Sequence, residues 1–149
     1  MTKGLAIALL PLCAAAALTG CGQIAPARVG YLTAVNIVRP KSFFRKPLTM
    51  TITNVNTVTA LYQDMRALKP FPSKGMHCPA EFAIDYRITF MNQSHIELTA
   101  YANLTGCSEV RLSSGTILWG VGKTGQAFWR ELATALGMPR VSDLWSGFR

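Results

Sequence analysis

The sequence predicts an α+β domain in which an antiparallel sheet of four or five strands carries two helices on one face and contains one disulfide. Residues 82–91 and 96–104 alternate apolar and polar side chains, which is the pattern of half-buried strands. Residues 55–68 and 124–136 repeat apolar side chains at three- and four-residue spacing, as helices with one buried side do. The last two cysteines of the chain supply the disulfide.

The first twenty residues have the composition of an export leader. Lys3 precedes an apolar stretch of residues 5–17, which is shorter than the roughly 20 residues of a membrane-spanning helix. The leader ends in Leu18-Thr19-Gly20-Cys21, which resembles the lipobox of bacterial lipoproteins at all four positions. This resemblance implies cleavage before Cys21, acylation of that cysteine with palmitate-type chains, and anchoring to the extracytoplasmic face of the cell membrane, or of the outer membrane in a host with two membranes. The alternative is an ordinary secreted protein.

The chain after the leader divides into a short tether and one domain. Residues 21–28 are small residues with a proline and no periodicity, and residues 29–149 suffice for one modest core. Loss of Lys3 lowers the formal net charge from +8 to +7. A protein surface with this net positive charge is expected to attract anionic lipid or cell-wall polymers. Nucleic acid is not expected, because the signatures of nucleic-acid-binding folds are absent.

The domain opens with two strands separated by a basic patch. Residues 31–38 and 48–53 are expected to be strands. Between them lie four cations and two aromatic residues, a possible membrane-surface patch: Arg39, Lys41, Phe43, Phe44, Arg45 and Lys46. The alternative places the two phenylalanines in the core with solvated charges around them.

The first helix is expected over residues 55–68. Asn54 or Thr53 can cap its free amide groups, and Pro70 and Pro72 prevent its continuation. Residues 71–77 are then expected to form a loop that leads to Cys78.

The clearest local feature is a hairpin of residues 82–104. A three-residue turn at 92–94 would keep both apolar sets on one face. The core pairs of that register are Phe90 with Ile96, Ile88 with Leu98, Tyr86 with Ala100 and Ile84 with Ala102. Its opposite face pairs Thr89 with Glu97, Arg87 with Thr99 and Asp85 with Tyr101. That face is either a solvated sheet surface or a flat recognition surface centred on Arg87 and Tyr101, which are residue types favoured in binding hot spots.

Cys78 and Cys107 are expected to form a disulfide. An exported protein meets an oxidising compartment, and the same register places Cys78 opposite Ser108, next to Cys107. A disulfide that closes a loop of about thirty residues should stabilise the fold by roughly 3.5 kcal/mol, because it lowers the entropy of the unfolded chain. No Cys-x-x-Cys and no histidine pair at ligand spacing occur, so neither a metal site nor a cofactor is expected.

The last part of the chain is expected to add two short strands and a helix. The strands are residues 110–112 and 116–119, joined by a turn at 113–115. The second helix is expected to open at Thr124 and to end at Gly137.

Two family resemblances extend this interpretation. Cys78-Pro79, Phe82, Tyr86, Phe90, Gly106-Cys107 and Phe128-Trp129 resemble the pattern of small lipoproteins from actinobacteria and related soil bacteria, which implies no activity. Met76-His77-Cys78-Pro79 with Cys107 is similar to the spacing of the subtilisin-inhibitor family, although the second disulfide of that family has no counterpart. That resemblance implies a protease-binding loop with Ala80 at the specificity position and Glu81 after it.

We therefore expect a membrane-anchored, non-enzymatic binding or envelope-associated module. A possible partner surface comprises Met76, His77, Ala80, Glu81, Arg87 and Tyr101. Two alternatives stay open: a protease inhibitor acting through the loop 76–81, and a small hydrolase without a recognisable motif. Ligand, physiological role, host and oligomeric state do not follow from the sequence.

Overall fold

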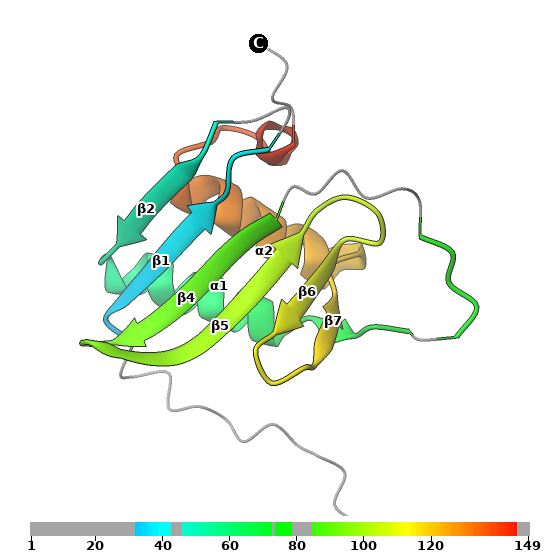
Figure 1. Cartoon of the computed structure of the whole chain (residues 1–149), viewed down its shortest axis with the longest axis horizontal. Helices are drawn as coiled ribbons and strands as arrows, with labels where there is room; N and C mark the ends of the chain where they lie inside the picture. The colour runs from blue at the N-terminus through cyan, green and yellow to red at the C-terminus, as the bar shows by residue number, and fades with distance from the viewer. Residues whose placement is uncertain (1–31, 43–45, 73, 79–84, 146–149) are drawn as a thin grey trace, which may run out of the picture.

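The computed structural model describes residues 32–42, 46–72, 74–78 and 85–145 (Figure 1). Their elements alternate short strands with two long helices, and the α+β class predicted from the sequence is confirmed. In chain order they are β1 Ala34–Arg39, β2 Leu48–Ile52, α1 Val55–Arg66, β3 Lys69–Pro70, β4 Asp85–Asn92, β5 His95–Asn103, β6 Glu109–Leu112, β7 Ile117–Trp119, α2 Gly122–Ala135 and the 3-10 helix η2 Val141–Leu144.

The sheet is antiparallel as predicted, but seven strands rather than four or five pair within the described residues. Their order is β2-β1-β4-β5-β6-β7-β3, so β4 and β5 lie near the middle (Figure 1). The main addition to the expected strands is β3, in which Lys69 and Pro70 pair with Trp119 and Leu118. A two-residue strand has no periodicity, and its proline sits at a sheet edge, where a missing amide is tolerated.

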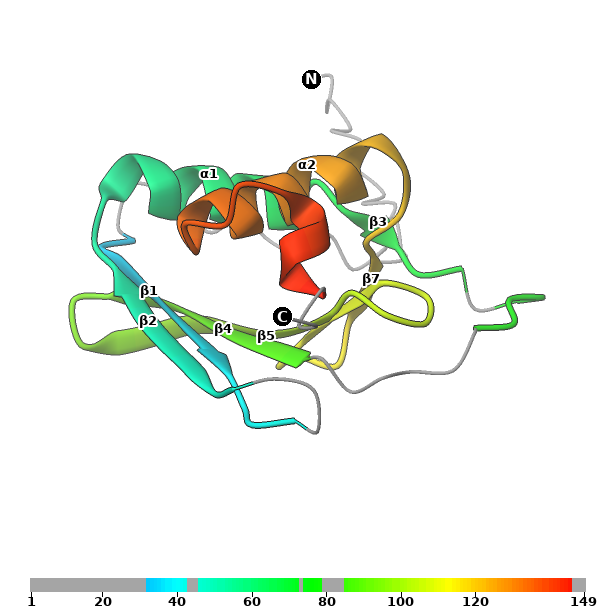
Figure 2. The same cartoon turned by 90° about the horizontal axis from the view of Figure 1, so that it is seen from above.

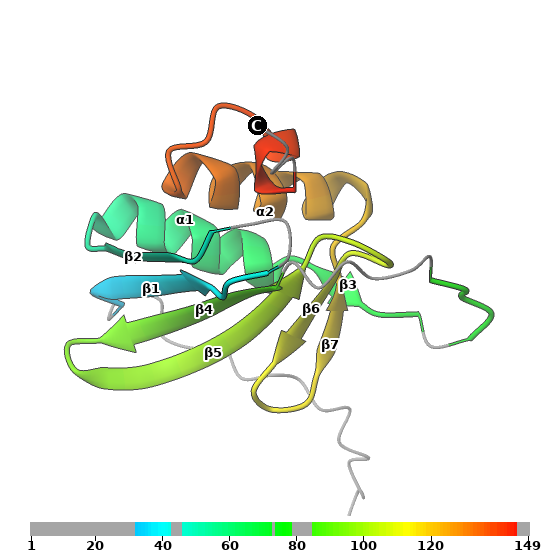
Figure 3. The ribbon, with the colours of Figure 1, turned by 45° about the horizontal axis from the view of Figure 1, so that its top comes forward.

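Both long helices cover the same face of the sheet, as predicted (Figures 2 and 3). α1 buries Val58, Leu61, Tyr62 and Met65, and the Tyr62 ring meets Phe90 of β4 edge-on at 5.2 Å. The core cluster continues with the helix-facing residues of the sheet and with α2: Val35, Ile37, Tyr86, Ile88, Phe90, Val110, Phe128, Trp129 and Leu132. The helices therefore leave one sheet face uncovered by any described element.

The helix ends agree with the sequence in part. The Asn54 side chain accepts a hydrogen bond from the Thr57 amide at 3.1 Å, which confirms the N-cap of α1. The N-cap of α2 is Val121 and makes no side-chain bond, so the expectation that Thr124 opens this helix was wrong. Gly137 follows the C-cap of α2 with φ of +67°, and its amide bonds the Thr134 carbonyl at 2.9 Å.

The hairpin forms with a different register from the expected one. Gln93 and Ser94 make a two-residue turn, Met91 pairs with Ile96, and a bulge near Glu97 then brings Phe90 opposite Leu98. The expected three-residue turn was therefore wrong. The expected register, which paired Phe90 with Ile96, differs from the observed one by two residues along β5. The apolar set of β4 still faces the helices because a shift of two residues keeps every side chain on its face. Ile96, however, moves to the other face and is 68% exposed.

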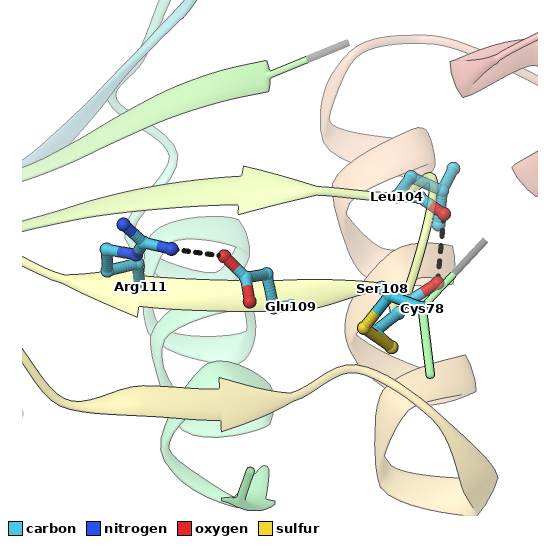
Figure 4. The surroundings of a disulfide bond; sticks show 6 residues. Cys78, Leu104, Ser108, Glu109 and Arg111 are labelled. Carbon is cyan, nitrogen blue, oxygen red and sulfur yellow. Dashed lines mark hydrogen bonds and ion pairs between the residues drawn. A yellow bond between two sulfur atoms is a disulfide. The ribbon is translucent and has the colours of Figure 1, made fainter. Parts of the chain in front are cut away.

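The disulfide joins Cys78 to Cys107, as predicted, with Cα atoms 5.0 Å apart (Figure 4). Cys107 is buried in the turn between β5 and β6, whereas Cys78 ends an exposed loop. Ser108 holds this turn by donating its hydroxyl to the Leu104 carbonyl at 2.9 Å. The bridge thus attaches the loop after β3 to the end of the central hairpin.

Candidate binding face

The uncovered side of the sheet is the candidate functional site, and we call it the open face. It presents the side chains that alternate with the core residues of β1, β4, β5 and β6. They are Asn36, Val38, Asp85, Arg87, Thr89, Met91, Ile96, Thr99, Tyr101, Glu109 and Arg111. The face thus combines hydroxyl, amide, charged and exposed apolar groups on a rigid sheet.

A row of three residues crosses the middle of this face. Arg87 of β4 pairs with Tyr101 of β5, and Tyr101 pairs in turn with Arg111 of β6. Adjacent strands are about 4.8 Å apart, so the two arginines start about 10 Å apart with a tyrosine between them. Tyr101 is 47% exposed. The corrected register is what brings Arg87 and Tyr101 together, since the expected one paired Arg87 with Thr99.

The two arginines differ in their partners. Arg111 donates to a carboxylate oxygen of Glu109 at 2.7 Å (Figure 4). The exposed Arg87 has no ion pair within the part of the chain that the structure describes. Its guanidinium, which carries five donors in a planar fork, is therefore available to a ligand.

Two shallow hollows adjoin on either side of Arg87 and Tyr101, which line both. The first, of about 370 Å³, is completed by Val38, Pro40 and Asp85. The second, of about 460 Å³, is completed by Asn36, Thr89, Met91, Ile96 and Thr99, and none of the described residues that line it is acidic. Arg87 and Tyr101 therefore lie at the boundary between the two hollows, where a ligand in either hollow can contact both.

The first hollow contains one carboxyl group with a perturbed pKa, that of Asp85. Burial raises the pKa of its carboxyl group, Glu109 raises that pKa further, and Arg111 offsets part of the shift. The protonated form is therefore favoured more than at an exposed aspartate, and it can donate a hydrogen bond.

The structure describes three residues of the basic patch predicted at residues 39–47, and one of the three is buried. Arg39 is 8% exposed, and its guanidinium donates to the Tyr86 hydroxyl at 3.1 Å and to the Lys46 carbonyl at 3.2 Å. The prediction that Arg39 belongs to a surface patch was thus wrong, because these bonds hold it in the interior. Lys41 and Lys46 are exposed. Phe43, Phe44 and Arg45 lie outside the described residues.

The chain enters the sheet at the end opposite this patch. The Thr33 amide donates to the Met91 carbonyl at 2.9 Å, and the Thr33 hydroxyl accepts from the Gln93 amide at 2.7 Å. These bonds place the start of β1 beside the turn of the β4–β5 hairpin. Lys41 lies beyond the other end of β1, roughly 20 Å away at 3.3 Å per residue.

Two further candidate residues, Met76 and His77, lie apart from the open face. Met76 and His77 are exposed in the loop before the disulfide, and Arg87 and Tyr101 lie on the sheet. Cys21, Ala80 and Glu81 lie outside the described residues. His95 is exposed and pairs with Asn92 at the hairpin turn. Within the described ranges, no group of three or more His, Cys, Asp or Glu side chains has the arrangement of a metal site.

Gly120, just before α2, and Gly125, within its first turns, allow close packing. A Cβ on Gly120 would lie 2.5 Å from the Ser108 carbonyl oxygen and 2.8 Å from Nε1 of Trp129, and a Cβ on Gly125 would collide with the Gly120 carbonyl. The indole of Trp129 donates to that same carbonyl at 2.8 Å. This close approach locks α2 onto the turn that holds the disulfide.

Comparisons with protein families, curated proteins and solved structures found no match for this chain. The resemblances to the small lipoproteins and to the subtilisin inhibitors therefore stay predictions. Among the described residues, no helix has both the length and the apolar character needed to span a bilayer.

Proposed function

We propose that this protein is a lipid-anchored extracytoplasmic binding module that contacts the cell envelope through the open face. The observation that carries the proposal is the pairing of Arg87 with Tyr101 between two adjoining hollows. Arginine and tyrosine dominate binding hot spots because each combines a large contact area with directed hydrogen bonds. The sheet beneath them is held by the core on its other side.

The anchor rests on the leader and its resemblance to the lipobox. Acyl chains on Cys21 would hold the domain at a membrane, and Leu32 lies eleven positions after Cys21. A chain of that length reaches at most about 38 Å. The domain would therefore stay close to the membrane with its β4–β5 turn beside the tether.

Mass spectrometry of the protein extracted from membranes tests the anchor. We expect a chain that begins at an acylated Cys21, with Cys78 and Cys107 joined. An intact, unacylated N-terminus on a cytosolic protein with both thiols reduced would contradict the proposed address.

Co-sedimentation with isolated cell-wall sacculi tests the open face. We expect the purified protein to pellet with sacculi. The substitutions Arg87→Gln and Tyr101→Leu should each weaken this binding. Arg130→Gln removes the same charge from an exposed position on α2, on the other side of the sheet, and should bind as the parent does. Equal losses in Arg87→Gln and Arg130→Gln would mean that net charge alone drives the association.

One observation keeps the inhibitor alternative open. Met76, His77 and Cys78 form an exposed segment that the disulfide fixes to Cys107. A protease inhibitor also needs an exposed loop on a rigid support. A titration of subtilisin with the protein tests it: inhibition in proportion to added protein, abolished by Ala80→Pro, would favour the loop over the open face.

A further inference from the structure

We infer that the ligand of the open face is a saccharide chain that carries carboxylate groups, with Arg87 binding a carboxylate and Tyr101 stacking on a sugar ring. This inference rests on the proposed function, because it names the ligand class of the same face. Charge, hydrogen-bonding groups and sheet topology each support it.

Arg87 is the group of the open face that can bind an anion. Arg87 is exposed and has no ion pair among the described residues, while Arg111 two strands away is neutralised by Glu109. The planar guanidinium group of Arg87 can bind a carboxylate through two parallel hydrogen bonds. At long range, the formal net charge of +7 that remains after the loss of Lys3 attracts a polyanion.

The second hollow suits a sugar. Asn36, Thr89 and Thr99 supply short, neutral groups that both donate and accept hydrogen bonds, although Asn36 already donates one N–H to the Thr51 hydroxyl at 3.0 Å. No acid stands among the described residues that line this hollow. Tyr101 offers a half-exposed ring, and Met91 and Ile96 offer apolar contact at the rim. A sugar ring has the matching character, with hydroxyl groups around its edge and apolar C–H groups on its faces.

The topology disfavours an extended peptide here. Arg87 of β4 pairs with Val38 of β1 and Tyr101 of β5, and Tyr101 pairs also with β6, so the backbone at the centre of the open face is engaged within the sheet. Peptides that add to a sheet need the free backbone of an edge strand. A ligand above Arg87 and Tyr101 is instead recognised by side chains. Two adjoining hollows then accommodate successive units of a chain.

Calorimetric titration of the purified full chain with an oligogalacturonate tests this inference. We expect saturable binding that Arg87→Gln weakens at least about tenfold, given the strength of charged hydrogen bonds. Tyr101→Leu should weaken it by a similar factor, whereas Tyr101→Phe, which keeps the ring, should bind almost as the parent does. Arg130→Gln is the matched charge control and should leave the affinity unchanged.

Three further probes separate the components of recognition. Methyl-esterified oligogalacturonate removes the carboxylates and keeps the sugars, and polyglutamate keeps carboxylates and removes the sugars. Both should bind at least tenfold more weakly than the free acid. Vesicles of anionic phosphatidylglycerol should not compete with the oligogalacturonate.

The possible outcomes are distinct. Polyglutamate binding as tight as oligogalacturonate, strong competition by the vesicles, or equal loss in Arg87→Gln and Arg130→Gln would overturn the saccharide assignment. So would failure of the parent protein to bind, or a Tyr101→Leu variant that binds normally. If sacculi still bind through Arg87 and Tyr101 in that case, the open face survives as the binding site and only its ligand class is wrong. Thermal melting checks that each variant is folded.

Discussion

Removal of one buried hydroxyl group should destabilise the domain strongly. The Tyr86 side chain is fully buried, and its hydroxyl donates to the Leu144 carbonyl of η2 at 2.9 Å and accepts from Arg39 at 3.1 Å. Tyr86→Phe removes both bonds while keeping the ring, and it leaves a buried carbonyl and part of a buried guanidinium without a partner. A neutral bond contributes about 1 kcal/mol and a charged one about 1.5–3 kcal/mol. We therefore expect a loss of about 2–4 kcal/mol.

Urea denaturation followed by tryptophan fluorescence measures this loss, and Tyr62→Phe is the matched control. Tyr62 is also buried and also packs in the core, but its hydroxyl makes no hydrogen bond among the described residues. Its removal should change the free energy of unfolding by under about 0.5 kcal/mol. Similar small losses for both variants would refute the claim that Arg39, Tyr86 and η2 form one buried hydrogen-bonded network. The assignment of Arg39 to the surface patch would then be the better one.

Three further predictions concern the disulfide, the glycine turn and Asp85. Replacing Cys78 and Cys107 by serine opens a loop closed across 29 positions and should lower the free energy of unfolding by about 3.6 kcal/mol in denaturant titrations; a loss below 1 kcal/mol would contradict the entropic argument. Gly120→Ala should lower the melting temperature more than Gly115→Ala, because the first Cβ meets the Ser108 carbonyl at 2.5 Å, whereas the second meets no atom within 4 Å and adds only the strain of a φ of +88°; the reverse order would show that the turn at Gly120 relaxes more easily than the backbone at Gly115. Because the pKa of Asp85 is raised in the fold, its protonated form favours folding below about pH 4, and this contribution is lost as pH rises through the raised pKa. Asp85→Asn should therefore gain stability relative to the parent between pH 3.5 and pH 7 in parallel unfolding curves, and an unchanged difference would mean that the carboxyl group is not perturbed.

The side-chain alternation of the sequence predicted the faces of the sheet better than its pairings. Residues such as Tyr86, Ile88 and Phe90 were assigned to the core because a period of two is readable without knowing any partner. The register depended on the turn, where Gln93 adopts a positive φ of 54° and the strand then bulges. Local residue types did not indicate either feature, so the expected pairs were displaced by two residues.

Arg39 shows why burial of a charged residue escapes a local pattern. The residues that follow it include Lys41, Ser42 and Arg45, which is typical of a surface segment. Its partner Tyr86 lies 47 residues away, and only the pairing of β1 with β4 brings the two together. The open face was foreseen in part for the same reason: Arg87 and Tyr101 were assigned to one face, but their adjacency and the two hollows depend on the register.

Hydroxyl-radical footprinting of the protein on cell-wall sacculi tests the central claim most directly, since Met76, Met91 and Tyr101 are reactive reporters on two different surfaces. The open face as binding site predicts that sacculi protect Met91 and Tyr101 from oxidation while Met76 in the loop reacts as in the free protein. Protection of Met76 with full reactivity of Tyr101 would contradict the account and move the contact to the disulfide-bound loop.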